Sequence, residues 1–172
     1  MSRFVFLGIV GLTGALAAAC TQPAPGEEVL ARIPVDSADE LLTRTGVTID
    51  PEISADGQGS ARIETTGTVT IRVSEVALAA VEEARLTYRA RLRSRDLEGR
   101  AYLEMWCVFP DQGEFFSRAL HAPLSGSVDW TLQETPFFLQ KGQSPSRVKL
   151  NLVIEGAGTV WIDDVSLVRA PL

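Results

Sequence analysis

Alternating apolar and polar positions run through most of the chain beyond residue 58. Strict two-residue alternation over short runs is typical of half-buried β-strands, and turn-forming residues separate these runs at short intervals. The candidate strands cover residues 60–65, 68–73, 84–95, 100–109, 114–121, 128–139, 147–155 and 159–168. Eight short strands without intervening helices predict an all-β fold, an antiparallel β-sandwich of the jelly-roll type.

One short helix is predicted ahead of the strands. Ser37 and Glu40 have the spacing of a capping box, and Gly46 would end the helix, which we place near residues 37–44. Residues 74–84 have helical propensity but are interpreted as a connection. With no internal repeat in view, we expect residues 28–172 to form a single domain, a length that suits one core.

An adjacent pair of aspartates interrupts the last apolar run. Asp163 and Asp164 follow Trp161 and Ile162 directly and precede Val165. Burying two carboxylates among apolar residues is costly unless they are hydrogen-bonded or bound to a metal ion. The pair therefore predicts a strand edge, a β-bulge or an ion site.

The candidate strands at residues 84–95 and 100–109 have apolar rows of opposite parity. In the first, the even positions are apolar and five odd positions are arginine, whereas in the second the odd positions are apolar. If residues 96–99 form a four-residue hairpin loop, placing both apolar rows on one face sets Arg91 opposite Glu104. The same register sets Arg93 opposite Tyr102 and Arg89 opposite Trp106. Charge-assisted and cation–π contacts would then balance the arginine row.

Two interpretations of this polar face stay open. It is either a solvated outer face, whose arginines pair with carboxylates on neighbouring strands, or a ligand platform. The argument for a platform is the combination of aromatic and arginine side chains, which is enriched at binding surfaces. Lys149 and Asn151 would join the platform if their strand is adjacent. The candidate ligand-binding residues are Arg89, Arg91, Tyr102, Glu104, Trp106, Lys149 and Asn151.

Composition narrows the chemistry. The net charge of −6 argues against a general nucleic-acid binder, and two cysteines imply no disulfide framework. His121 is the only histidine and Cys107 falls on the core parity, which argues against zinc and against a nucleophilic triad. A pair of carboxylates among Glu104, Glu114 and Glu134 remains the only candidate for catalysis, as in a glycosidase. The arginine expected opposite Glu104, however, lowers its pKa and suits a role in a salt bridge better than one as a general acid. We therefore expect a protein that is not an enzyme.

The first twenty residues have the features of an export signal. A short basic start at Met1 to Arg3 precedes an apolar run from Phe4 to Leu16, and three alanines lead to Cys20. This resembles a bacterial lipoprotein signal, which implies cleavage before Cys20 and lipidation of that residue. The alternative is an ordinary secretory signal. Residues 20–27 would be the lipidated cysteine and a Pro-rich tether, and Thr21 favours the outer membrane by the same resemblance.

Several segments of the β region resemble one fold family. They are Gly59-Ser60, Ala84 to Ala90, Asp129-Trp130, Val148 to Leu152 and, most specifically, Trp161-Ile-Asp-Asp-Val-Ser-Leu167. Together these resemble the galactose-binding-domain-like jelly rolls, in particular the carbohydrate-binding modules attached to many glycanases. The resemblance implies sugar binding and a structural calcium ion. Asp163 or Asp164 matches the family's C-terminal aspartate near that ion, and Asp56, in a turn, would be a second contributor because calcium takes several oxygens.

From these features we expect a membrane-anchored, non-catalytic carbohydrate-binding-like lipoprotein of the cell envelope. Its partners would be the membrane, through Cys20, and a glycan. One alternative is an assembly lipoprotein that binds another envelope protein. A weaker alternative is a polysaccharide-active glycoside hydrolase.

Overall fold

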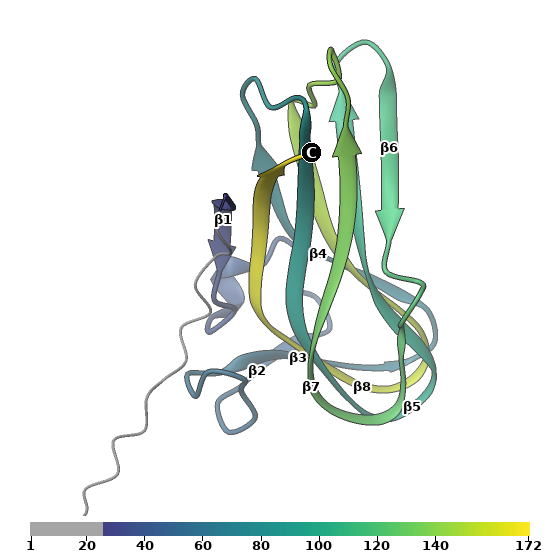
Figure 1. Cartoon of the computed structure of the whole chain (residues 1–172). Coiled ribbons are helices and arrows are strands. Elements are labelled where there is room, and N and C mark those ends of the chain that lie inside the picture. The colour runs from purple at the N-terminus through teal and green to yellow at the C-terminus, as the bar shows by residue number, and fades with distance from the viewer. Residues whose placement is uncertain (1–25) are drawn as a thin grey trace, which may run out of the picture.

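The computed structural model describes residues 26–172 as an antiparallel β-sandwich (Figure 1). Its eight strands form one continuous sheet that folds over on itself. They are β1 (Glu28–Ile33), β2 (Val47–Asp50), β3 (Ser60–Thr66), β4 (Val69–Ala77), β5 (Ala84–Phe109), β6 (Gly113–Arg118), β7 (Leu124–Leu139) and β8 (Arg147–Pro171). No helix in this part of the chain is long and apolar enough to cross a membrane. The predicted signal peptide and Cys20 lie outside the described residues.

The two longest strands, β5 and β8, pair along most of their length and pass together from one layer into the other (Figure 1). In the first layer the N-terminal half of β5 pairs with β7, and the C-terminal half of β8 pairs with β1 and β3. In the second layer the C-terminal half of β5 pairs with β6, and the N-terminal half of β8 pairs with β4. The sheet thus closes one end of the sandwich by bending.

Glycines make this bend possible. Gly99 and Gly156 are opposite each other in the register, and both have positive φ values, 141° and 118°. A Cβ atom on Gly99 would overlap the carbonyl oxygen of Glu155, and one on Gly156 would overlap that of Glu98. The two backbones therefore cross more closely than any side chain would allow.

The predicted hairpin at residues 96–99 is wrong. The chain bends there, with positive φ at Asp96 and Gly99, but it continues as one strand instead of reversing. The reason is that β8 runs beside both halves of β5 and supplies backbone partners on each side of the bend. The proposed pairings of Arg89, Arg91 and Arg93 across a hairpin are therefore lost. Residues 147–155 and 159–168, predicted as separate strands, are likewise both part of β8.

The core lies between the two layers and is built from the parities that the sequence predicts. The even positions of the first half of β5 and the odd positions of the second half are buried, as are inward positions of β3, β4 and β8. The buried residues include Ile63, Ile71, Leu86, Tyr88, Leu92, Leu103, Met105, Cys107, Leu150, Leu152 and Ile162. Cys107 is a free thiol, and burial raises its pKa to about 12, so it is inert at neutral pH.

The capping box is present, but the helix it begins is short. Ser37 accepts a hydrogen bond from the backbone of Asp39, Glu40 accepts from the backbone of Ser37, and the turn is a 3₁₀ helix, η1 (Ala38–Glu40). Strands β1 and β2, on either side of it, have no counterpart among the predicted strands because their alternation is short and broken by polar residues.

Candidate functional site

Outward-facing side chains of β6, β5, β8 and β4 form a continuous surface on the second layer, which we call the Trp106 face. Its members are Arg72, Tyr102, Glu104, Trp106, Phe116, Arg118, Lys149 and Asn151. The register sets Trp106 between Phe116 and Lys149. Five of the seven predicted ligand-binding residues meet here: Tyr102, Glu104, Trp106, Lys149 and Asn151.

A chain of hydrogen bonds crosses the Trp106 face around Glu104. Arg118 Nε donates to Glu104 Oε2 at 2.6 Å, and Asn151 Nδ2 donates to Glu104 Oε1 at 2.9 Å. Arg72 Nε in turn donates to Asn151 Oδ1 at 2.6 Å. Glu104 is only 5% exposed and Asn151 only 2%. A carboxylate can be buried this far because both of its oxygens have charge-assisted or amide partners.

These hydrogen bonds also determine the protonation state of Glu104. Burial alone would raise its pKa, but hydrogen bonds from Trp106, Asn151 and Arg118 outweigh burial and hold the pKa below its usual value. A general acid needs the opposite shift. The other two candidate glutamates are also ion-paired, Glu114 with Lys149 and Glu134 with Arg89. None of the three has the environment of a glycosidase acid.

The accessible part of the Trp106 face is aromatic and cationic. The rings of Trp106 and Phe116 lie with centroids 5.0 Å apart and tilted by 47°, and Phe116 is half exposed. The Arg118 guanidinium lies 4.4 Å from the centre of the Phe116 ring. Tyr102, by contrast, is 3% exposed and its hydroxyl donates to Glu155 at 2.9 Å. Tyr102 therefore supports the face from beneath.

Arg89 and Arg91 belong to the other layer. Arg89 makes two hydrogen bonds to Glu27, at 2.7 and 2.8 Å, and a third to Glu134 at 2.7 Å. Arg91 Nε lies 3.9 Å from Asp164. These arginines follow the first of the two interpretations, in which the arginine row pairs with neighbouring carboxylates. Arg118 and Phe116 take their place on the Trp106 face, and only the register of β6 with β5 could have indicated them.

The Asp163–Asp164 pair sits in a β-bulge. Two steps along β5, from Arg89 to Arg91, correspond to three along β8, from Ser166 to Asp163, and Asp164 has a φ of 46°. Asp163 is fully buried, and its two oxygens accept backbone N–H bonds from Ala55 and Asp164, each at 2.7 Å. The bulge, one of the alternatives that the sequence predicted, is thus the backbone geometry that allows this carboxylate inside.

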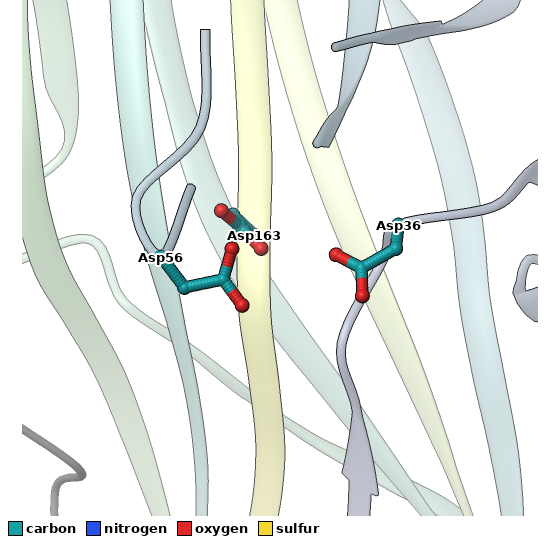
Figure 2. A group of neighbouring side chains, drawn as sticks. All are labelled: Asp36, Asp56 and Asp163. Carbon is teal, nitrogen blue, oxygen red and sulfur yellow. The ribbon is translucent and has the colours of Figure 1, made fainter. Parts of the chain in front are cut away.

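Asp163 also meets two other carboxylates. Figure 2 shows Asp36, which follows β1, and Asp56, from the loop after β2, turned toward Asp163; one oxygen from each lies within 4.8 Å of the others. Asp36 Oδ1 is buried with no hydrogen-bond partner among the described residues. Asp164 is not part of the group. Of the three predicted metal ligands the structure brings together Asp56 and Asp163, and it adds Asp36, which was missed because β1 was not recognised.

Among the residues that the structure describes, no basic side chain forms an ion pair with this cluster. Burial, and then the charge of Asp56, raises the pKa of Asp36, and burial raises the pKa of Asp163 despite its backbone N–H donors. Carboxylates that meet without a basic partner would be stabilised by a hard divalent ion. Calcium, which takes six to eight oxygens, fits this donor set if loop carbonyls or water complete it.

Comparison with solved structures identifies the class of fold. The chain resembles the CBM22-1 xylan-binding domain of Paenibacillus barcinonensis Xyn10C (TM-score 0.54, 14% identity, 87% of this chain and 99% of that one). It also resembles TmCBM61, solved with β-1,4-galactotriose (0.54, 14%, 81% and 97%), and a family 16 carbohydrate-binding module (0.53, 11%, 71% and 84%). No family model and no curated protein matches the chain. The likeness shows a shared fold, the β-sandwich of carbohydrate-binding modules.

Proposed function

We propose that this protein is a non-catalytic glycan-binding protein and that the Trp106 face is its binding surface. The observation that supports this most strongly is the pair of partly exposed Trp106 and half-exposed Phe116 beside Arg118, on a sheet face of a fold shared with carbohydrate-binding modules. The apolar faces of sugar rings stack on aromatic side chains, and cationic side chains bond to their hydroxyls.

The groups around the aromatic pair suit hydroxyl recognition. Lys149 Nζ lies 2.6 Å from Glu114 Oε1, and Lys149 is the neighbour of Trp106 across the β5–β8 register. Arg118 is positioned from below by Glu104, and Arg72 by Asn151. A network fixed in this way presents donors with little loss of conformational entropy on binding, which favours a weak but specific contact with a polysaccharide.

Calcium enters this proposal as a structural ion. Asp36, Asp56 and Asp163 would hold it between the end of β1, the loop after β2 and the bulge in β8. Because these three segments are far apart in the sequence, an ion there would fasten the N-terminal segment and the loop onto the sandwich. We assign it no part in sugar contact.

We further propose that Cys20 is lipidated and that the domain is attached to the cell envelope, at the outer membrane. The support is the sequence of residues 1–21, which resembles a lipoprotein signal. The short tether would hold the sandwich close to the bilayer, where a glycan-binding domain would meet envelope polysaccharide.

A second candidate function is the binding of another envelope protein. It is favoured by a cluster of phenylalanines at the end of the sandwich opposite the bend, where Phe109, Phe115, Phe137 and Phe138 line a small pocket. Phe115 and Phe138 are about half exposed, and exposed apolar groups of this kind mark interaction surfaces. A partner whose crosslinking is lost in Phe138→Ala but kept in Trp106→Ala would support this function.

Affinity electrophoresis against a panel that includes xylan and β-1,4-galactan tests glycan binding. The parent protein should be retarded by at least one polysaccharide, and Trp106→Ala should abolish the retardation. Trp130→Ala is a matched control, since Trp130 is a partly buried tryptophan on β7 in the other layer. Retardation that persists in Trp106→Ala, or that no polysaccharide produces, would refute the proposal.

A further inference from the structure

A second cluster of cationic and aromatic groups lies on the outer surface of the first layer, centred on Trp161. The register of three adjacent strands sets Trp161 of β8 between Arg62 of β3 and Arg93 of β5. The guanidinium carbons of Arg62, Arg93 and Arg95 lie 6.0, 5.9 and 5.2 Å from the centre of the indole ring. Three guanidinium groups thus share one aromatic ring.

The indole is held rigidly. Trp161 is only 1% exposed, and its Nε1–H donates to Asp50 Oδ2 at 3.0 Å. The other oxygen of Asp50 accepts backbone N–H bonds from Glu52 and Ile53, at 3.1 and 3.0 Å. The indole ring is therefore held in one orientation beneath the three arginines, and it is too deeply buried to stack on a ligand itself.

The three guanidinium groups are only partly neutralised. Arg62 is paired with Glu64, and Arg93 lies 3.3 Å from Asp129, whose side chain is 85% exposed. Arg95 has no carboxylate partner within ion-pair distance among the described residues, and the neighbouring Asp96 is bonded to Ser127. An exposed pair such as Arg93–Asp129 is weak and readily exchanged. The cluster can therefore accept an anion at Arg95 and Arg93.

A cleft opens directly beside these two arginines. It has a volume of about 190 Å³ and is lined by Ile53, Arg93, Arg95, Ser127, Asp129 and Trp161. This is smaller than the roughly 300–1,000 Å³ of sites for drug-sized ligands, so it suits a single small unit. Its lining combines two guanidinium groups with a hydroxyl and a carboxylate, which can bond to the hydroxyls of a sugar.

We propose that this cleft binds a carboxylated sugar, that is, a uronate unit, through Arg93 and Arg95. The planar guanidinium forks match a carboxylate in a bidentate geometry, and the oxygens of Asp129 and Ser127 accept hydrogen bonds from ring hydroxyls. The site lies in the opposite layer from the Trp106 face and shares no residue with it. Uronate binding in this cleft can therefore be confirmed or refuted independently of the function proposed for the Trp106 face.

The test is an NMR titration with sodium glucuronate of the folded domain, residues 26–172, labelled with the NMR-active nitrogen isotope. Glucose and sodium sulfate at matched ionic strength separate the sugar and anion contributions. The reporter is the indole N–H signal of Trp161, assigned by its loss in Trp161→Phe. The variants are Arg95→Gln and, as a control with the same charge change, Arg32→Gln, an exposed arginine on β1.

We expect glucuronate to shift the Trp161 signal saturably and to bind more tightly than either glucose or sulfate. Loss of one charge-assisted contact should weaken binding about tenfold in Arg95→Gln and leave Arg32→Gln unchanged. The spectrum of Arg95→Gln must otherwise overlay that of the parent, which shows that it is folded. Glucuronate that binds no better than glucose or no better than sulfate overturns the proposal, as does equal binding by the parent and Arg95→Gln. Repeating the titration with Trp106→Ala should give the parent result.

Discussion

At the scale of single residues, two kinds of buried carboxylate have opposite electrostatic environments. Glu104 has a guanidinium and an amide on its oxygens, so its charged form is favoured. Asp36 and Asp163 lose solvent through burial and lie close to another carboxylate, so their charged forms are disfavoured. The first environment stabilises the fold at neutral pH, and the second stabilises it only when the cluster binds a cation or a proton.

The cluster leads to a prediction whose sign depends on calcium. In Asp36→Asn, one charge of the cluster is removed, so the melting temperature in a chelator should rise by a few degrees or stay level with that of the parent. Calcium should raise the melting temperature of the parent by several degrees and that of the variant by much less. Differential scanning calorimetry with and without calcium measures this. If calcium does not change the melting temperature of the parent, the proposed calcium site is wrong.

The same cluster predicts a pH dependence. A raised pKa in the folded state means that the folded protein binds protons more tightly than the unfolded chain, so without calcium the cluster costs stability as pH rises above about 4. Glu104 behaves oppositely: its lowered pKa contributes stability at neutral pH that is lost as pH falls through the folded-state value. Glu104→Gln should therefore cost about 1–3 kcal/mol at pH 7 and much less below pH 4. A cost that is equal at both pH values, measured by urea unfolding, would contradict this.

At the scale of elements, the bends in β5 and β8 organise the molecule. They let two strands serve both layers, and they place the Trp106 face on one layer and the Trp161 cluster on the other. The backbones cross at Gly99 and Gly156, where a side chain has no room. The position of the bend, therefore, depends on glycine.

Substitution at the crossing should be severe. Gly156→Ala introduces a Cβ against the Glu98 carbonyl and an unfavourable positive φ, so it should lower the free energy of unfolding by more than about 4 kcal/mol or prevent folding. Gly67→Ala is the control, because nothing lies within 4 Å of its Cβ position and its φ is ordinary. Its free energy of unfolding should change by less than about 1 kcal/mol. Similar costs in urea unfolding of the two variants would show that the crossing tolerates a side chain.

The same bends explain what the sequence could and could not predict. Parity assigned the core rows on both halves of β5 correctly, because alternation depends only on which face is buried. A turn and a bend, however, have the same local signal, here Asp96 and Gly99, and only the long-range pairing with β8 distinguishes them. Alternation alone predicted that Trp106 and Glu104 share one outward face. Arg89 was placed on that face wrongly, because its register came from a hairpin that does not form.

At the scale of the whole molecule, an acidic chain carries two surfaces on which cationic side chains lie beside an aromatic ring. The net charge is −6, yet the Trp106 face presents Arg118 and Lys149, and the Trp161 cluster presents Arg95. Arg118 and Lys149 are ion-paired with Glu104 and Glu114, as most other arginines are with carboxylates. Arg95 has no carboxylate within ion-pair distance among the described residues. An accessible cation without an ion pair, such as Arg95, can attract an anionic partner to an acidic protein.

Attachment to the membrane can be tested in the whole protein. Cys20→Ser should lose incorporation of labelled palmitate in a bacterial host and move from the membrane fraction to the soluble fraction, because the acyl chains supply the binding energy. Cys107→Ala retains Cys20 and should keep both label and membrane association. Palmitate incorporation in Cys20→Ser at the level of the parent would rule out this site of lipidation.

The most direct test of the central claim is the affinity of Trp106→Ala for the polysaccharide that retards the parent, measured by isothermal titration calorimetry. Stacking on the indole should make the variant at least about tenfold weaker, equivalent to about 1.4 kcal/mol, while Trp130→Ala stays within about twofold of the parent. Circular dichroism must show that both variants are folded. A dissociation constant for Trp106→Ala within twofold of the parent value would contradict the assignment of the Trp106 face as the glycan-binding surface.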